Sequence, residues 1–161
     1  MRALGAAAAL ACAGTLALTG GTGATGDSKA PECRGVPVTI SGTTVGETID
    51  GTGGDDVISA GRGGDIVRGG GGEDMICGDD GGDQVFGDAG ADEIHGGFGG
   101  DNEIGGAGDD RIKGQHGKDA LRGRGGDDNL RGGTGADGVN GGPGHDKCSH
   151  RPNDTRFTSC E

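Results

Sequence analysis

The stretch GDDGGDQVFGDAGADEIHGGFGGD, residues 78–101, decides the fold of this chain. Its only sizeable apolar side chains are Val85, Phe86, Ile94 and Phe98. Glycine and aspartate fill the space between these side chains, and the arrangement repeats every nine residues. Counted from Gly51, the sequence contains eleven consecutive nine-residue blocks up to residue 149, without an insertion.

The blocks share four nearly constant positions. Position four is glycine and position six is aspartate in all eleven blocks. Position one is glycine in ten, with Ala60 as the exception, and position eight is Ile, Val or Leu in nine. Glu103 and Cys148 are the two exceptions at position eight. A weaker block at 42–50, with Glu47 at position six, precedes the array.

The composition excludes an ordinary globular core. The 161 residues include 43 glycines and three phenylalanines but no tyrosine or tryptophan, and the formal net charge is −12. Such a composition usually indicates disorder. The constant phase of glycine and aspartate argues against a disordered or merely structural glycine-rich tract, because those tracts do not hold one acidic residue in register.

The pattern G-G-x-G-x-D-x-U-x, with U a large aliphatic residue, resembles the calcium-binding nonapeptide repeat of the RTX (hemolysin-type) family. The resemblance covers residues 51–149. It implies an all-β fold, a right-handed parallel β-roll in which two blocks make one coil and calcium lies between stacked turns. Ice binding is another role for such rolls. It is disfavoured here because the outward positions seven and nine are chemically mixed.

The chemistry of one block agrees with that resemblance. Glycines at positions one, two and four permit positive φ, so the first six residues can form a tight turn that exposes its carbonyls. The carboxylate at position six reaches the same place, and hard oxygen donors suit a hard cation with six to eight ligands. We expect the last three residues to form a strand with position eight pointing inward.

The position-six aspartates are therefore the candidate calcium ligands. Consecutive blocks should alternate between two edges of the roll. We call Asp56, Asp74, Asp92, Asp110, Asp128 and Asp146 the first edge, and Asp65, Asp83, Asp101, Asp119 and Asp137 the second edge. The gaps between stacked turns allow up to about nine calcium ions.

Calcium should be part of the fold rather than an addition to it. About ten buried aliphatic side chains are too few to offset the conformational entropy of ordering so many residues. The eleven aspartates stacked in two columns also repel one another. We expect the metal-free chain to be unfolded and to fold on binding calcium with a Kd of roughly 10⁻⁴–10⁻³ M.

The N-terminus has the features of a secretory signal peptide over residues 1–24, cut near Ala24. Arg2 precedes a long apolar run, and small residues follow it. A lipoprotein signal would instead use Cys12, but the preceding Ala9-Leu10-Ala11 fits such a signal poorly and leaves too short an apolar run before it. No second apolar stretch approaches the roughly 20 residues of a membrane span. We predict a secreted protein, in some settings associated with the cell surface.

The remaining chain divides into a lead-in and capping segment at 25–50, the eleven-block roll at 51–149 and a capping tail at 150–161.

Four cysteines remain after cleavage of the signal peptide, and they allow three pairings. We favour Cys33–Cys77 and Cys148–Cys160; free thiols or a single disulfide are the alternative. The irregular spacing of His145, Cys148, His150 and Cys160 disfavours a zinc site.

Block six departs from the pattern, with Glu103 at position eight and Ile104 at position nine. One interpretation is a kink or a contact with a partner. We favour the other, a small local bulge that turns Ile104 inward in place of Glu103.

Blocks seven to nine differ from the rest by their positive charge. Their basic residues are Arg111, Lys113, Lys118, Arg122, Arg124 and Arg131. With calcium bound, the stretch Arg111–Arg131 could attract an anionic cell-wall polymer or glycan. The alternative is simple solvation of outward positions. Aromatic residues do not interleave with these bases, which disfavours specific binding of nucleic acid.

We predict that the protein is not an enzyme. The segment 25–50 is too short for a catalytic domain and holds no nucleophile–base constellation, and the aspartates of the roll are committed to metal. The leading function is a structural or adhesive calcium-binding module of the cell surface or matrix. The alternative is an accessory that stabilises a separately encoded extracellular enzyme or assists its secretion.

Overall fold

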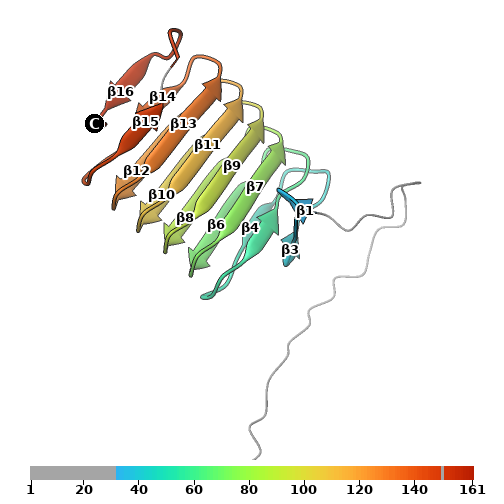
Figure 1. The fold of residues 1–161 in the computed structure, drawn as a ribbon. Helices are drawn as coiled ribbons and strands as arrows, with labels where there is room; N and C mark the ends of the chain where they lie inside the picture. The colour runs from blue at the N-terminus through green and yellow to red at the C-terminus, as the bar shows by residue number, and fades with distance from the viewer. Residues whose placement is uncertain (1–31, 150) are drawn as a thin grey trace, which may run out of the picture.

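The chain folds into two parallel seven-stranded sheets that face each other, as Figure 1 shows. This computed structural model describes residues 32–149 and 151–161. The predicted signal peptide, Cys12 and His150 lie outside the described residues. No helix long and apolar enough to cross a membrane occurs in the part of the chain that is described.

From β3 on, strands with odd labels form one sheet and strands with even labels form the other. The odd-numbered sheet contains β3 (Ile40–Ser41), β5 (Val57–Ser59), β7 (Met75–Asp80), β9 (Glu93–Phe98), β11 (Arg111–His116), β13 (Asn129–Thr134) and β15 (Lys147–Ser149). The even-numbered sheet contains β4 (Thr48–Asp50), β6 (Ile66–Gly71), β8 (Gln84–Ala89), β10 (Asn102–Ala107), β12 (Ala120–Gly125), β14 (Gly138–Asn140) and β16 (Arg156–Thr158). A short antiparallel hairpin, β1 (Glu32–Cys33) and β2 (Val36–Pro37), precedes them.

Each strand pairs with the strand two blocks away. Ile76 aligns with Ile58 on one side and with Ile94 on the other, a constant offset of 18 residues. Consecutive blocks therefore alternate between the sheets, and two blocks make one coil. This confirms the predicted parallel β-roll. Both sheets also continue past residues 51–149, through β3 and β4 at one end and β16 at the other.

The core consists of two inward rows of position-eight side chains. The odd-numbered sheet contributes Ile58, Ile76, Ile94, Ile112 and Leu130, and the even-numbered sheet contributes Ile49, Val67, Val85, Leu121 and Val139. Each is at most 7% exposed. The partly buried Ile40, Cys148, Phe157 and Cys160 pack against these rows. Period-two alternation of the strands points positions seven and nine away from this interior. Ser59, Cys77 and His95, at position nine of the odd-numbered sheet, are nevertheless buried.

The strands are longer than the three residues that we expected. From β6 to β13 each strand has six residues, which are positions seven to nine of one block and one to three of the next. The ladder skips position one: after Ile104↔Arg122 the next pair is Gly106↔Arg124. The backbone bends at this point and resumes pairing at position two. The tight turn is thus confined to positions four to six.

Two disulfides attach the terminal segments to the odd-numbered sheet. They are Cys33–Cys77, from the hairpin to β7, and Cys148–Cys160, from β15 to the tail. The favoured pairing is confirmed. Since the second disulfide uses both Cys148 and Cys160, those thiols are not available to a metal ion.

The predicted bulge in block six is wrong. Glu103 aligns with Val85 on one side and Leu121 on the other, with no residue inserted. Glu103 is fully buried, and Ile104 lies in the outer row beside Phe86. A one-residue slip would have reversed every side chain of β10 and misaligned its hydrogen bonds. The ladder keeps its register and places a carboxylate in the interior.

Candidate metal sites

The position-six aspartates lie in the turns directly before the strands and form two columns, as the block count predicted. First-edge residues precede odd-numbered strands and second-edge residues precede even-numbered ones. Within a column, one oxygen of every carboxylate except that of Asp56 accepts a hydrogen bond from a backbone N–H 18 residues earlier. Asp74 N donates to Asp92 Oδ1 at 2.9 Å, and Asp83 N donates to Asp101 Oδ1 at 2.9 Å. These bonds fix each carboxylate in its turn.

The second carboxylate oxygen has no partner in most of these turns. The Oδ2 atom is buried and without a hydrogen bond in Asp65, Asp74, Asp83, Asp92, Asp101, Asp110, Asp119, Asp128, Asp137 and Asp146. Buried polar atoms normally have a partner, and an unpaired charged oxygen is costly. Ten such atoms at equivalent positions indicate a ligand that binds them.

Position-one glycines form a cradle for these oxygens. A Cβ placed on Gly87 would lie 2.2 Å from Asp92 Oδ2 and 2.6 Å from the carbonyl oxygen of Gly105. On Gly105 it would lie 2.0 Å from Asp110 Oδ2. Glycine is needed here because backbone and carboxylate approach closely. Positive φ is found at positions two and four instead, for example at Gly106 and Gly108.

Burial makes these carboxylates hard to ionise while no cation is present. Loss of hydration raises the pKa of Asp110 to about 7 and the pKa values of Asp83 and Asp119 to about 6. The backbone N–H bonds oppose this shift, and neighbouring aspartates of the same column add to it. A cation beside the columns would remove the repulsion and restore the charged forms.

The donor set fits calcium. Each turn offers a carboxylate oxygen and nearby backbone carbonyls, which are the hard ligands that calcium prefers. Among the described residues, no three acidic, imidazole or thiol side chains converge into a metal site by themselves. Backbone carbonyls and water would therefore complete the coordination shell of each ion. Bound calcium would supply positive charge between stacked turns.

The ends of the columns differ from the middle. Asp56 was predicted as a ligand, but its Oδ2 accepts hydrogen bonds from Thr52 N at 2.7 Å and Thr52 Oγ1 at 2.8 Å. This oxygen is already satisfied. At the other end, Asp154 Oδ1 accepts a bond from Asp137 N at 3.3 Å and extends the second edge. The nine-residue count missed Asp154 because it follows Asp137 by 17 residues instead of 18.

Position five carries a third row of hydrogen bonds that the sequence pattern did not indicate. Asp127 N donates to Asp109 Oδ1 at 2.8 Å, and His145 N donates to Asp127 Oδ1 at 2.9 Å. These bonds are exposed. They connect turns of the first edge on the solvent side.

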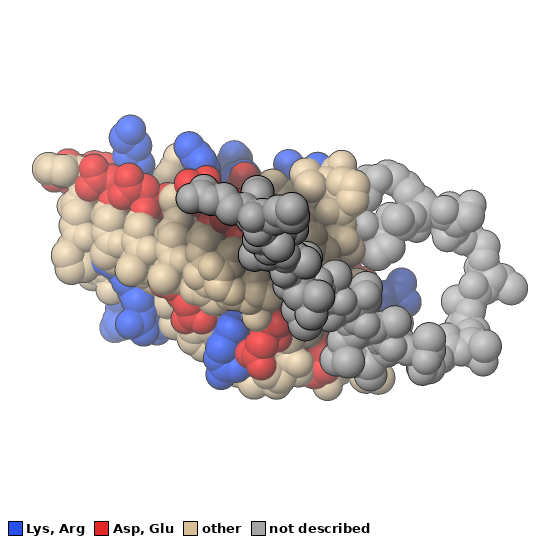
Figure 2. All heavy atoms as spheres, turned by 90° about the horizontal axis from the view of Figure 1, so that it is seen from below, with Lys and Arg blue, Asp and Glu red and all other residues tan. Residues whose placement is uncertain are grey.

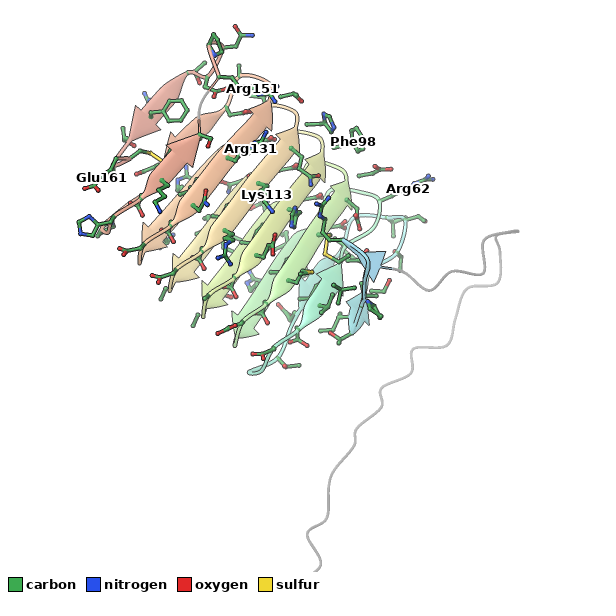
Figure 3. All side chains as sticks on the ribbon, in the orientation of Figure 1. Arg62, Phe98, Lys113, Arg131, Arg151 and Glu161 are labelled. Atoms are coloured by element: carbon green, nitrogen blue, oxygen red, sulfur yellow. A yellow bond between two sulfur atoms is a disulfide. The ribbon has the colours of Figure 1, made fainter. Side chains whose placement is uncertain are left out.

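The basic residues of blocks seven to nine are divided between the two outer faces. Lys113 and Arg131 are neighbours on the odd-numbered sheet, as Figure 3 shows. Arg122 and Arg124 belong to the even-numbered sheet. Figure 2, with Lys and Arg in blue, shows basic side chains on both sides of the roll. The charge is thus spread over two surfaces.

A parallel β-roll whose turns stack buried carboxylates with unsatisfied oxygens is a calcium-binding solenoid. Sequence comparison agrees with this class. The sequence model of the RTX calcium-binding nonapeptide repeat matches in four copies, over residues 41–76, 78–112, 104–130 and 117–148. The chain belongs to this family. No curated protein matches the chain.

Proposed function

We propose that the protein is a secreted calcium-binding module whose roll folds when it meets extracellular calcium. The observation that carries the proposal is the pair of columns of buried Oδ2 atoms without partners. The eleven position-six aspartates, from Asp56 to Asp146, are its candidate ligands, with Asp56 as the weakest because Thr52 occupies its second oxygen. Up to about nine ions fit between the stacked turns.

The test is a calcium titration of the mature chain, followed by circular dichroism and isothermal calorimetry together. We expect a β-rich signal to appear with calcium and to disappear in excess EGTA, with one coupled transition. A compact β-rich state after exhaustive removal of calcium, or no uptake at millimolar calcium, would contradict the proposal.

A matched pair of variants localises the effect. Asp92→Asn removes a column carboxylate between two stacked turns, whereas Asp88→Asn removes an exposed carboxylate only four residues away. We expect the first variant to need more calcium for folding and the second to titrate like the wild type. Equal effects of the two substitutions would mean that total charge, rather than the column, controls binding.

The roll then serves as a structural or adhesive module at the cell surface or in the matrix, without catalytic activity. Exposed Arg122 and Arg124 on one face, and exposed Arg131 on the other, support binding of an anionic wall polymer or glycan once calcium has neutralised the columns. Lys113, beside Arg131, is half-buried and pairs with Glu93 at 2.7 Å. Cosedimentation with such a polymer, with and without calcium and over a range of salt concentrations, tests this. Replacement of each basic pair by glutamine identifies the face.

The alternative role is an accessory module for a separately encoded extracellular enzyme. Pull-down from culture fluid in the presence of calcium distinguishes the two roles. Wall polymer in the bound fraction supports the adhesive module, and one defined protein supports the accessory role.

A further inference from the structure

Glu103 is the one acidic side chain buried in the hydrophobic rows of the described roll. It occupies position eight of block six, in β10, and aligns with Val85 and Leu121 of the neighbouring strands. Its exposure is 0%. Neither Oε1 nor Oε2 has a hydrogen-bond partner. A buried carboxyl group with two unsatisfied oxygens is strongly destabilising unless something binds it. This side chain therefore needs an explanation that core packing does not provide.

The side chain points at the second-edge turns. A Cβ placed on Gly96 would lie 2.4 Å from Glu103 Oε1, 2.7 Å from Asp101 Oδ2 and 2.8 Å from the carbonyl oxygen of Gly114. Three oxygens, two of them from carboxylates, thus converge beside the Gly96 backbone. Because Glu103 Oε1 and Asp101 Oδ2 both lie close to the same point, they are at most about 5 Å apart, and one calcium ion with Ca–O distances of about 2.3–2.6 Å can bridge them.

The neighbouring cradles of this edge lack the third oxygen. At Gly78 the only oxygens among the nearest atoms are the Gly96 carbonyl and Asp83 Oδ2, at 2.4 and 2.7 Å. At Gly114 they are Asp119 Oδ2 and the Gly132 carbonyl, at 2.4 and 2.7 Å. Aliphatic residues occupy position eight in the blocks of those cradles, Val85 and Leu121. The Gly96 cradle is therefore distinguished by Glu103.

We propose that Glu103 is an additional calcium ligand, which acts with Asp101 in a second-edge site at the middle of the roll. The inference rests on the proposed function, since it assigns one more residue to a calcium site. Glu103 brings a second carboxylate to a cradle that otherwise holds one. Calcium affinity rises with the number of charged ligands, so this site should be the tightest in the array and the first to fill.

The test compares calcium binding by wild type, Glu103→Gln and Glu103→Ile. Glu103→Gln keeps the size of the side chain and removes its charge, and Glu103→Ile restores the aliphatic residue found at most position-eight sites. Calorimetry gives the affinity of each step, and equilibrium dialysis counts the bound ions. We expect both variants to lose the tightest step, with its Kd weakened about tenfold or more. Glu73→Gln, which removes an exposed glutamate, should leave that step unchanged.

The two proposals fail in different ways. If Glu103→Ile raises the melting temperature in calcium and in chelator alike and leaves every binding step unchanged, Glu103 is only a poorly packed core residue and the inference is overturned. If the wild type takes up no calcium, the proposed function itself fails. Since Glu103→Ile matches the repeat pattern, its folding in saturating calcium keeps the comparison interpretable.

Discussion

The two sheets have the same backbone but different interiors. In the odd-numbered sheet, the central row from Ile58 to Leu130 is aliphatic at every coil. In the even-numbered sheet, the corresponding row is interrupted at Glu103. The odd-numbered sheet also carries both disulfides, through Cys77 and Cys148. The odd-numbered sheet therefore has an unbroken apolar row and covalent links, whereas the even-numbered sheet has a buried carboxylate in the middle of its row.

This difference indicates how the fold divides its stabilising interactions. A row of buried aliphatics stabilises whether or not a cation is present. Buried carboxylates stabilise only when their charge is compensated. The five predictions below test that division, beginning with the largest expected effect.

Gly105→Ala should abolish calcium-dependent folding. The new Cβ would lie 2.0 Å from Asp110 Oδ2, so the carboxylate would have to leave its cradle. A clash combined with displacement of a buried charge is expected to cost at least about 5 kcal/mol of unfolding free energy. Circular dichroism in saturating calcium measures the loss. Gly53→Ala is the control, because nothing lies within 4 Å of its Cβ; a large effect there would count against the cradle.

Removal of the Cys33–Cys77 disulfide should cost more than removal of Cys148–Cys160. The bridged cysteines are 44 and 12 residues apart, respectively. The loop-entropy relation then gives about 4 kcal/mol for the first and about 3 kcal/mol for the second. Urea unfolding of the two double-serine variants in saturating calcium measures both values. The reverse order would show that the hairpin contributes little to the roll.

Ile94→Ala tests the aliphatic row of the odd-numbered sheet. Ile94 is fully buried at the middle of that row, and truncation should reduce the unfolding free energy by about 3 kcal/mol. Ile40→Ala, at the partly exposed end of the same row, should cost clearly less. Chemical unfolding in saturating calcium compares them. Similar losses at both positions would argue against a central core that is more stable than the ends.

Acid should stabilise the metal-free roll. The pKa of Asp110 is raised from 3.8 to about 7, and those of Asp83 and Asp119 to about 6. Because the folded form binds these protons more tightly, their stabilising contribution is complete below pH 3.8 and is lost as the pH rises through about 6 to 7. Circular dichroism of calcium-stripped protein should show β structure increasing on acidification. Asp110→Asn should remove the part of the transition nearest neutral pH.

Glycine at strained position-two sites should give a small gain. Arg124 and Gln115 have φ of 83° and 76°, values that disfavour side chains. Relief of this strain, less the entropy cost of glycine, gives up to about 1 kcal/mol for Arg124→Gly or Gln115→Gly. Arg122→Gly, in the same strand as Arg124, should instead destabilise the roll. Thermal melts in saturating calcium measure these differences, and a loss at both strained positions would contradict the explanation.

The nine-residue period predicted the features that depend on spacing alone. Alternation of blocks between two sheets, the two aspartate columns and the inward aliphatic rows all follow from it. The disulfides were predictable as a preference, because each connects a terminal segment to the array. The structure agrees with these expectations.

Other features depend on distances between atoms in the folded chain, which the nine-residue period does not specify. Positive φ was expected at position one, where the actual constraint is the close approach of a carboxylate, as at Gly105. At block six the repeat pattern favours a small bulge that turns Ile104 inward in place of Glu103. The strand pairing is continuous on both sides of β10, so Glu103 stays in the inward row. The Oδ2 atom of Asp56 is satisfied by the backbone N–H and the hydroxyl of Thr52, and threonine at that position is not part of the repeat pattern.

The alternation of blocks limits how such a chain can change its length. Duplication of a single block would transfer every later strand to the opposite sheet, so Cys148 and the tail would change sides relative to the hairpin. Duplication of 18 residues would add one whole coil and leave all rows continuous. The array therefore tolerates insertion or deletion of repeats in steps of two blocks. Related arrays with the same end segments should differ in length by multiples of one 18-residue coil.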